Sequence, residues 1–222
     1  MLRSAGVWAG DSRDLHIQIP PGWARPNADG LRTHWEIPRF EMETRWRAGR
    51  MQALWRAIHC LNGEHAIAAL ESAVHRRFVS IEDARRIGRL APRRLQPDAF
   101  DLARGAQSGN ETIVRRRLQR EGYWVESQAG IPGMGHHDLL VEHCLALEVD
   151  GKEWHGEARY EADRARDLHS EGLGRHVLRL SSRQIHLEWQ STLAVIERVV
   201  ADAVRQRDRR FERTLIRFDD PL

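Results

Sequence analysis

Apolar residues recur at helical spacing in two consecutive stretches of the N-terminal half. Residues 50–61 carry an apolar side chain every three or four positions, and residues 64–78 repeat the pattern with smaller side chains. Ser80 then precedes two acidic residues, which is typical of an N-cap that opens a third helix, ending near Leu90. Ahead of these helices, residues 1–46 alternate apolar and polar positions between prolines and glycines, which predicts short strands joined by turns.

The C-terminal half predicts a helix, three strands, a helix, a strand and a long final helix. Ser108 and Glu111 fit a capping box at the start of the first helix. In a capping box, the side chain of each residue accepts a hydrogen bond from the backbone amide of the other residue. A turn is expected at 130–135. The later elements are expected at 123–127, 136–142, 145–150, 157–171, 176–180 and 188–210. The strand at 176–180 should lie parallel to a neighbour, because a helix crosses between them.

Length and cysteine content limit the class of protein. A chain of 222 residues forms one large domain or two small ones. Its two cysteines, Cys60 and Cys144, are far apart and predict no disulfide framework. No apolar run approaches the length of a membrane span, mean hydropathy is −0.60, and the N-terminus lacks a signal-peptide pattern. We expect a cytoplasmic protein without a membrane partner; a homodimer is left open.

Charge is nearly balanced, with a formal net charge of +3. The basic residues are mostly arginines and gather at 91–94, 115–117 and 205–210. Arginine binds phosphate through two parallel hydrogen bonds, and such contacts supply most non-specific affinity for nucleic acids. Helices with charged outer faces show the same pattern in proteins of other functions. Both interpretations of these clusters stay open.

Three carboxylates stand on what reads as a β-hairpin, at Asp138, Glu148 and Asp150. Side chains alternate along a strand, so Glu148 and Asp150 share a face. The other arm of the hairpin can bring Asp138 beside them. Converging carboxylates repel unless a cation lies between them, and Mg²⁺ prefers such oxygen ligands. A metal there could activate water and stabilise a phosphodiester transition state. Solvated acids at strand ends are the alternative.

The surrounding residues resemble the PD-(D/E)xK nuclease superfamily. They are most similar to the very-short-patch-repair (Vsr)-like endonucleases and to an uncharacterised bacterial domain family grouped with them. The resemblance runs from Ser108 to about Val200, roughly half the chain. Its motifs are S-G-N-E at 108–111, E-G-Y-W-V-E at 121–126, Asp138, L-E-V-D-G-K-E-W-H at 147–155, R-Y-E-A-D-R-A-R-D at 159–167 and H-V-L-R-L at 176–180. It implies a restriction-endonuclease-like mixed sheet flanked by helices.

The resemblance also implies a ligand set for Mg²⁺ or Mn²⁺. Asp138 matches the metal-binding aspartate of the family, and Glu148 matches the first acid of its E-x-K half-motif. Val149 lies where a backbone carbonyl completes the metal shell. Asp150 occupies the position of the superfamily lysine and would bind a second metal or orient water. Glu111 matches a glutamate of the first helix that supports the metal site.

Further residues are assigned to proton transfer and to DNA. Lys152 is the nearest lysine to the expected position, and His155 matches a histidine that serves acid–base chemistry in the Vsr-like enzymes. Trp154 matches a tryptophan that contacts DNA, although a core tryptophan is an equal alternative. The arginines of the next predicted helix could clamp the phosphate backbone; they are Arg159, Arg164 and Arg166.

The chain departs from the family pattern in three places. His137 stands where a proline commonly precedes the aspartate, the lysine is displaced from position 150, and Glu153 replaces an aromatic residue. The Vsr enzymes also carry a structural zinc site. Here His136, His137, His143 and Cys144 lack the paired close spacing of such sites, so no zinc is predicted among them.

Residues 1–105 are expected to form a smaller α+β domain, and residues 106–222 the nuclease domain. The first region resembles one that precedes the nuclease in bacterial relatives and is similar to part of an abortive-infection antitoxin. We expect it to position the nuclease. The sequence thus predicts an α/β protein that is a Mg²⁺- or Mn²⁺-dependent endodeoxyribonuclease in repair or defence. The alternatives are a nucleic-acid-binding or regulatory protein without turnover, and a partner protein of a toxin system.

Overall fold

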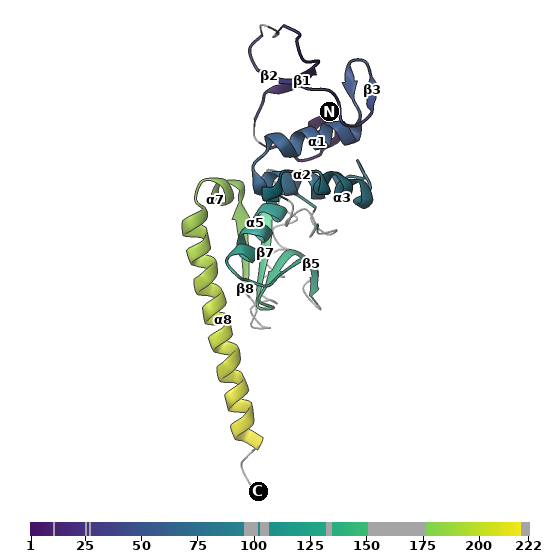
Figure 1. Cartoon of the computed structure of the whole chain (residues 1–222). Coiled ribbons are helices and arrows are strands. Elements are labelled where there is room, and N and C mark those ends of the chain that lie inside the picture. The colour runs from purple at the N-terminus through teal and green to yellow at the C-terminus, as the bar shows by residue number, and fades with distance from the viewer. Residues whose placement is uncertain are drawn as a thin grey trace, which may run out of the picture. The chain divides into compact units, whose positions relative to one another are not determined.

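The chain forms two compact units, Met1–Arg104 and Gly105–Leu222 (Figure 1). The computed structural model describes residues 1–10, 12–24, 26, 28–95, 102, 107–131, 135–150 and 176–218. Both units combine helices with strands, so the protein is of mixed α/β class.

The N-terminal unit contains the three predicted helices, preceded by short strands. In chain order its elements are η1 (Arg3–Ala5), β1 (Leu15–Ile19), β2 (Leu31–Trp35), β3 (Met42–Thr44), β4 (Arg47–Ala48), α1 (Arg50–Cys60), α2 (Gly63–His75), α3 (Ile81–Arg89) and η2 (Arg93–Leu95). The predicted N-cap is confirmed, because the Ser80 hydroxyl accepts a hydrogen bond from the Asp83 amide at 3.0 Å. Asn62 caps α2 in the same manner.

The hydrophobic core of this unit lies among its helices. Leu54 and Ile58 of α1 pack with Ile67 and Leu70 of α2 and with Ile87 of α3, and each is at most 1% exposed. β1 and β2 form a parallel two-stranded ribbon. Within the described part of the chain, no side chain of either strand belongs to that core. Something other than apolar burial in the core therefore holds the ribbon in place.

The C-terminal unit is a four-stranded sheet with helices against it. Its elements are α5 (Gly109–Arg120), β5 (Val125–Ile131), β6 (Gly135–Val141), β7 (Leu145–Asp150), β8 (His176–Ser181), α7 (Ser182–His186) and α8 (Trp189–Phe218). The strand order is β5-β6-β7-β8, with β6 antiparallel to both neighbours in the hairpins and β8 parallel to β7. The parallel placement of the last strand was predicted and is confirmed.

The predicted end of the first strand is wrong, and one short helix of this unit was not predicted. β5 runs to Ile131, so the residues taken as the start of a turn continue the strand and pair with β6. Gln128 interrupts that pairing with a positive φ of 53°. The short helix α7 was not predicted. Ser181 and Gln184 give it a complete capping box, which the sequence pattern around it does not single out.

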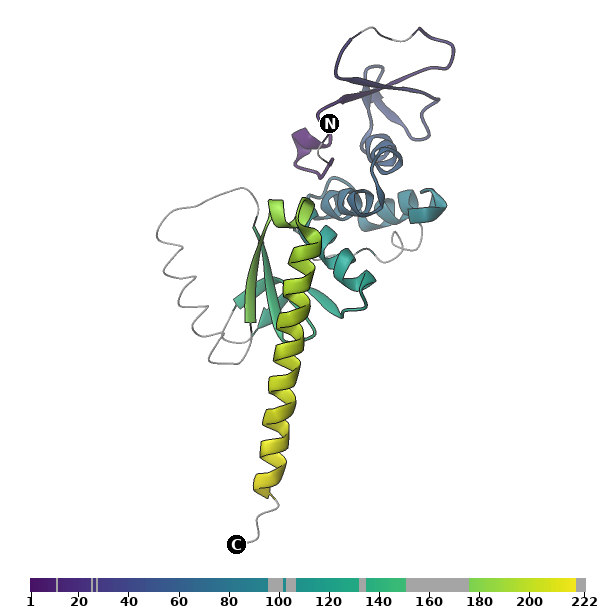
Figure 2. The same ribbon diagram turned by 90° about the vertical axis from the view of Figure 1, so that its left-hand side faces the viewer.

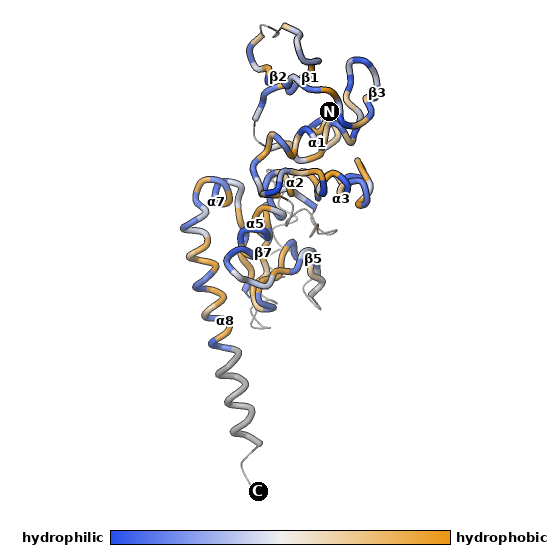
Figure 3. The backbone as a smooth tube through the Cα atoms, in the orientation of Figure 1, coloured by the Kyte–Doolittle hydropathy of each residue, from blue (hydrophilic) through white to orange (hydrophobic). Residues whose placement is uncertain are grey.

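Alternate residues of the central hairpin point toward one face of the sheet and make the middle of that face apolar. Leu139 and Val141 of β6 and Leu145 and Leu147 of β7 are all 0% exposed. α5 lies against β5 and β6, and α8 lies against β7 (Figure 2). Apolar positions recur along the N-terminal half of α8, as Figure 3 shows. The buried helix residues are Ile113, Val114, Leu118, Leu193, Ile196, Val200 and Ala203.

A tight turn fixes the register of the β6–β7 hairpin. Glu142 and His143 both have positive φ, and the Cys144 amide donates to the Val141 carbonyl at 3.0 Å. Two central residues of positive φ match the twist of antiparallel strands. The His143 ring stacks on Trp124 with centroids 3.8 Å apart, and Glu142 accepts a hydrogen bond from the Trp124 amide. The turn is therefore held from both sides.

Cys60 and Cys144 are both free. Across the described residues, no helix combines the length and apolar character that a bilayer crossing requires.

Candidate functional site

The end of the β6–β7 ladder brings two predicted ligands together. Leu139 pairs with Leu147 in the last regular position of the ladder. Beyond this pair, a side chain replaces the backbone as hydrogen-bond acceptor: Oδ2 of Asp138 accepts a hydrogen bond from the Val149 amide at 2.8 Å. The predicted metal-binding aspartate is thus fixed beside the main chain of Val149, whose carbonyl the family resemblance assigns to the same metal.

Glu111 lies close to this pair on the first turn of α5. Ser108 caps that helix by accepting from the Glu111 amide at 3.2 Å. The Glu111 carboxylate reaches back to the Gln107 amide at 2.9 Å, one residue before the N-cap, and also accepts from Gln128 Nε2 at 3.0 Å. The side chain is 4% exposed.

The pKa of Glu111 depends on its burial and on the residues around it. Burial raises the pKa of Glu111, the hydrogen bond from the Gln107 amide opposes that shift, and the negative charge of Asp138 adds to it. The two carboxylates are therefore near enough to repel each other. A cation between them would relieve this repulsion.

Glu148 has a different set of partners. Its Oε2 lies 2.8 Å from Arg179 Nε, across the parallel β7–β8 ladder where the two residues pair directly. Its Oε1 lies 3.3 Å from Nδ1 of His137. His137 is 2% exposed, and neither ring nitrogen makes a hydrogen bond to a described residue, so the 3.3 Å contact lacks hydrogen-bond geometry. Among the described residues, Arg179 is the ion-pair partner of Glu148 across the ladder.

All of the predicted proton-transfer and DNA-binding residues fall outside the described part of the chain, as does the predicted helix at 157–171. The residues are Lys152, Trp154, His155, Arg159, Arg164 and Arg166. The backbone of Asp150 ends β7 and pairs with Ser181 of β8, but its side chain is not described. The described site therefore consists of Glu111, Asp138, Glu148 and Val149.

The basic run at 115–117 does not form the exposed phosphate-binding surface that was considered. Arg115 and Arg116 are 3% and 6% exposed. Arg117 donates to the Ile185 carbonyl and lies over the Trp189 ring, 5.0 Å from its centroid. The helix α5 packs into its unit on several sides, so these arginines serve internal contacts.

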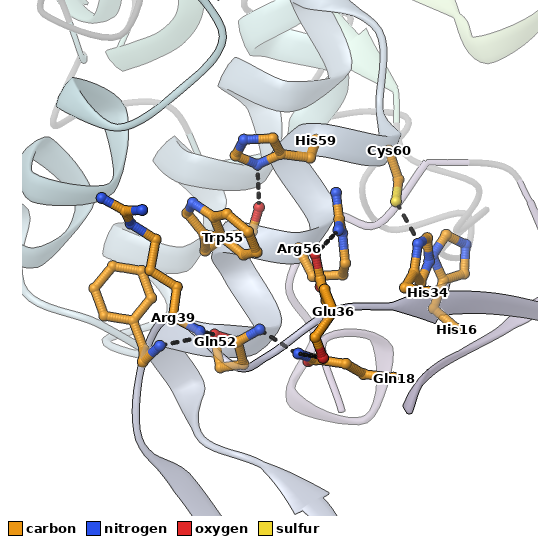
Figure 4. A network of polar contacts seen from close by, with 11 residues as sticks. His16, Gln18, His34, Glu36, Arg39, Gln52, Trp55, Arg56, His59 and Cys60 are labelled. Carbon is orange, nitrogen blue, oxygen red and sulfur yellow. Dashed lines mark hydrogen bonds and ion pairs between the residues drawn. The ribbon is translucent and has the colours of Figure 1, made fainter. Parts of the chain in front are cut away.

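A second polar cluster lies in the N-terminal unit and was not predicted (Figure 4). It contains His16 of β1, His34 of β2 and Cys60 at the end of α1, whose possible ligand atoms all lie within 4.8 Å of one another. Among the described residues, this is the one group of three or more acidic, histidine or cysteine side chains so close together. The described carboxylates of the C-terminal unit do not meet that criterion.

The three residues were missed because no spacing rule joins them. His16 and His34 are eighteen positions apart, on strands whose parallel pairing the sequence did not predict. Cys60 follows a further twenty-six positions later. The available signal was the repeat of an isolated histidine within each of two alternating runs, L-H-I-Q-I and L-R-T-H-W.

Comparisons with known proteins leave the family open. No protein-family model matches the chain, and neither a curated protein nor a solved structure matches it.

Proposed function

We propose that the C-terminal unit is a metal-dependent endonuclease that hydrolyses phosphodiester bonds in DNA. The observation that carries the proposal is the Asp138 carboxylate, bonded to the Val149 amide beside the buried Glu111. It joins three positions that the resemblance to PD-(D/E)xK nucleases assigns to one metal site. The strand order and the helices on one face of the sheet support a restriction-endonuclease-like fold as part of the same proposal.

The donor atoms fit a hard divalent cation. Glu111, Asp138 and Glu148 offer carboxylate oxygens, and Val149 offers its backbone carbonyl. Oxygen ligands of this kind suit Mg²⁺ and Mn²⁺. When bound, the ion would supply positive charge to the phosphate and lower the pKa of water.

The protein side chains would then orient the reaction. Asp138 is held by its bond to Val149, so it presents its carboxylate in one direction. Asp150, at the end of β7, would bind a second metal or orient water, and Lys152 or His155 would move the protons. Trp154 and the arginines Arg159, Arg164 and Arg166 would contact DNA. These roles follow from the family resemblance.

A second candidate function is a nucleic-acid-binding or regulatory protein that has lost turnover. One specific contact favours it. Arg179 neutralises Glu148, a predicted ligand, through a 2.8 Å ion pair. The arginine competes with a metal for this carboxylate, and the displaced lysine also favours a protein without turnover.

Calorimetry with Mg²⁺ and Mn²⁺ separates the two candidates. An active nuclease binds a divalent ion in the wild type, and Asp138→Ala abolishes that binding while Glu126→Ala, which removes an exposed carboxylate of β5, leaves it intact. Cleavage of supercoiled plasmid, single-stranded DNA and mismatched duplex then identifies the substrate. A well-folded wild type that binds DNA but neither binds the metal nor cuts would establish the regulatory function instead.

A further inference from the structure

The parallel ribbon of the N-terminal unit meets α1 through a layer of polar side chains (Figure 4). Gln52, Arg56 and Cys60 are four residues apart, so they form one stripe of the helix. Gln52 donates to Gln18 Oε1 at 2.9 Å, and Gln52 Oε1 accepts from the amides of Arg39 and Phe40, both at 2.9 Å. The middle and the end of the stripe meet β2 and the residue that follows it.

Arg56 and Cys60 complete the contact. Arg56 pairs with Glu36, just beyond β2. Cys60 Sγ lies 3.7 Å from His34 Nε2, and the same His34 nitrogen lies 3.1 Å from His16 Nδ1. The two strands and the helix therefore converge on three atoms, two imidazole nitrogens and one sulfur. All three side chains are half-buried.

We propose that His16, His34 and Cys60 bind a Zn²⁺ ion that fastens the β1–β2 ribbon to α1. With zinc bonds of about 2.05 Å to nitrogen and about 2.3 Å to sulfur, tetrahedral geometry places two nitrogens about 3.3 Å apart and nitrogen and sulfur about 3.6 Å apart. The observed separations are 3.1 Å and 3.7 Å. Two donor separations thus fit zinc with small adjustments, and the ligand atoms of His16 and Cys60 lie within 4.8 Å of each other.

The chemistry of the donors fits the same ion. Imidazole and thiolate together are the usual ligands of protein zinc sites. Burial lowers the pKa of His34 to about 4, with Arg56 as the next cause, and burial and Arg32 lower that of His16. Asp14 and Glu36 oppose these shifts. Neutral imidazoles are the form that binds a metal, and the Cys60 thiol would release its proton to solvent on binding.

The position of the cluster gives the ion a structural task. A two-stranded ribbon is marginally stable in water on its own, and parallel pairing is weaker than antiparallel. No described side chain of β1 or β2 belongs to the apolar core formed by the helices. A metal bound by both strands and by α1 supplies the missing cross-link. Three protein ligands leave a fourth tetrahedral position for water or for a donor from a partner.

The test uses the untagged, reduced full-length protein, with Zn²⁺ for calorimetry and Co²⁺ as a spectroscopic substitute. We expect one ion per chain at this site and a thiolate-to-cobalt charge-transfer band. Cys60→Ser should remove the band, and Cys60→Ser and His34→Gln should each weaken Zn²⁺ binding by more than about 100-fold, beyond the loss typical of outer-shell changes.

Two matched variants control for zinc held elsewhere. Cys144→Ser removes the other free cysteine, and His59→Gln removes the histidine next to Cys60, whose Nδ1 lies 2.8 Å from the Trp55 carbonyl. Both should keep the wild-type affinity and the cobalt spectrum. Hydrogen exchange should show that Zn²⁺ protects residues 15–35 in the wild type and not in Cys60→Ser. Failure of the wild type to bind Zn²⁺, or binding that survives Cys60→Ser and His34→Gln, would overturn the proposal and leave a hydrogen-bonded histidine pair.

Discussion

Arg179 is the residue that competes with a metal in the proposed nuclease site. Its guanidinium lies 2.8 Å from Glu148, and the two side chains are 36% and 22% exposed. Partly exposed ion pairs contribute at most about 1 kcal/mol. A divalent ion that binds Glu148 must first displace this arginine, so the ion pair lowers the metal affinity by a limited factor.

Replacing Arg179 with glutamine should therefore tighten Mg²⁺ binding by up to about fivefold, the factor that corresponds to ~1 kcal/mol. Calorimetry on both proteins measures the change. Arg183→Gln is the matched control, because Arg183 pairs with the exposed Glu188 on the same unit and not with a predicted ligand. The same affinity in Arg179→Gln as in the control would show that Arg179 does not compete with the metal for Glu148.

Glu111 gives the site a pH dependence in the absence of metal. Its pKa in the folded unit is raised above the ordinary 4.5, so the folded unit holds the proton more tightly than the unfolded chain. Its contribution to the free energy of unfolding is complete below pH 4.5 and is lost as the pH rises through the raised pKa. Glu111→Gln should abolish this loss.

The measurement is urea unfolding of the C-terminal unit at a series of pH values with a chelator present. Pulsed hydrogen exchange of the α5 amides monitors the unfolding. The wild type minus Glu111→Gln difference isolates this carboxyl from the others that titrate in the same range. Identical pH profiles for the two proteins would mean that burial and the charge of Asp138 do not raise the pKa of Glu111.

The helices and strands that local sequence patterns predicted are those that interactions between nearby residues determine. Residues 145–150 form β7 as expected, because alternating apolar residues and a tight turn specify that strand from within. The caps at Ser80 and Ser108 were readable because N-capping depends on residues three apart. The hairpin was expected to bring Asp138 beside Glu148 and Asp150; in the structure its carboxylate accepts from the amide of Val149, the residue between them.

Contacts between residues that are distant in the sequence could not be predicted from it. The pairing of β1 with β2 joins strands twelve residues apart, and only the folded ribbon brings His16 to His34. Glu148 was expected to face a metal, yet its direct neighbour on β8 is Arg179, a pairing set by a crossover connection of more than twenty residues. The burial of Arg115 and Arg116 likewise reflects packing of α5 on several sides, which a run of like charges does not reveal.

The N-cap of α5 couples helix stability to the site. Ser108→Ala should cost about 1 kcal/mol of local stability, the usual loss when a capping hydroxyl is removed. It should also weaken Mg²⁺ binding, because Glu111 stands in the capped first turn. Ser80→Ala removes an equivalent cap from α3 in the other unit. It should lower protection of α3 in hydrogen exchange by a similar amount and leave Mg²⁺ binding unchanged; equal effects on binding would contradict the coupling.

For the whole molecule, charge limits how DNA is attracted. The net charge is only +3, and two of the three arginines at 115–117 are buried. The proposal leaves Arg159, Arg164 and Arg166 as the phosphate contacts. Three contacts predict that the logarithm of the affinity for duplex DNA falls against the logarithm of salt concentration with a slope of roughly −2.7. Fluorescence anisotropy without a catalytic metal measures it. A flat dependence would exclude phosphate contacts, and a much steeper one would require a wider basic surface.

The most direct test of the central claim is single-turnover nicking of supercoiled plasmid with Mg²⁺ or Mn²⁺ by the wild type and Asp138→Asn. Asparagine keeps an oxygen that can accept from the Val149 amide, so the hairpin is preserved while one negative charge is lost. The account predicts metal-dependent nicking in the wild type and in Glu126→Gln, and a rate at least about 100-fold lower in Asp138→Asn, as when one charge-stabilising group is removed from an active site. Equal nicking by Asp138→Asn and the wild type would contradict it.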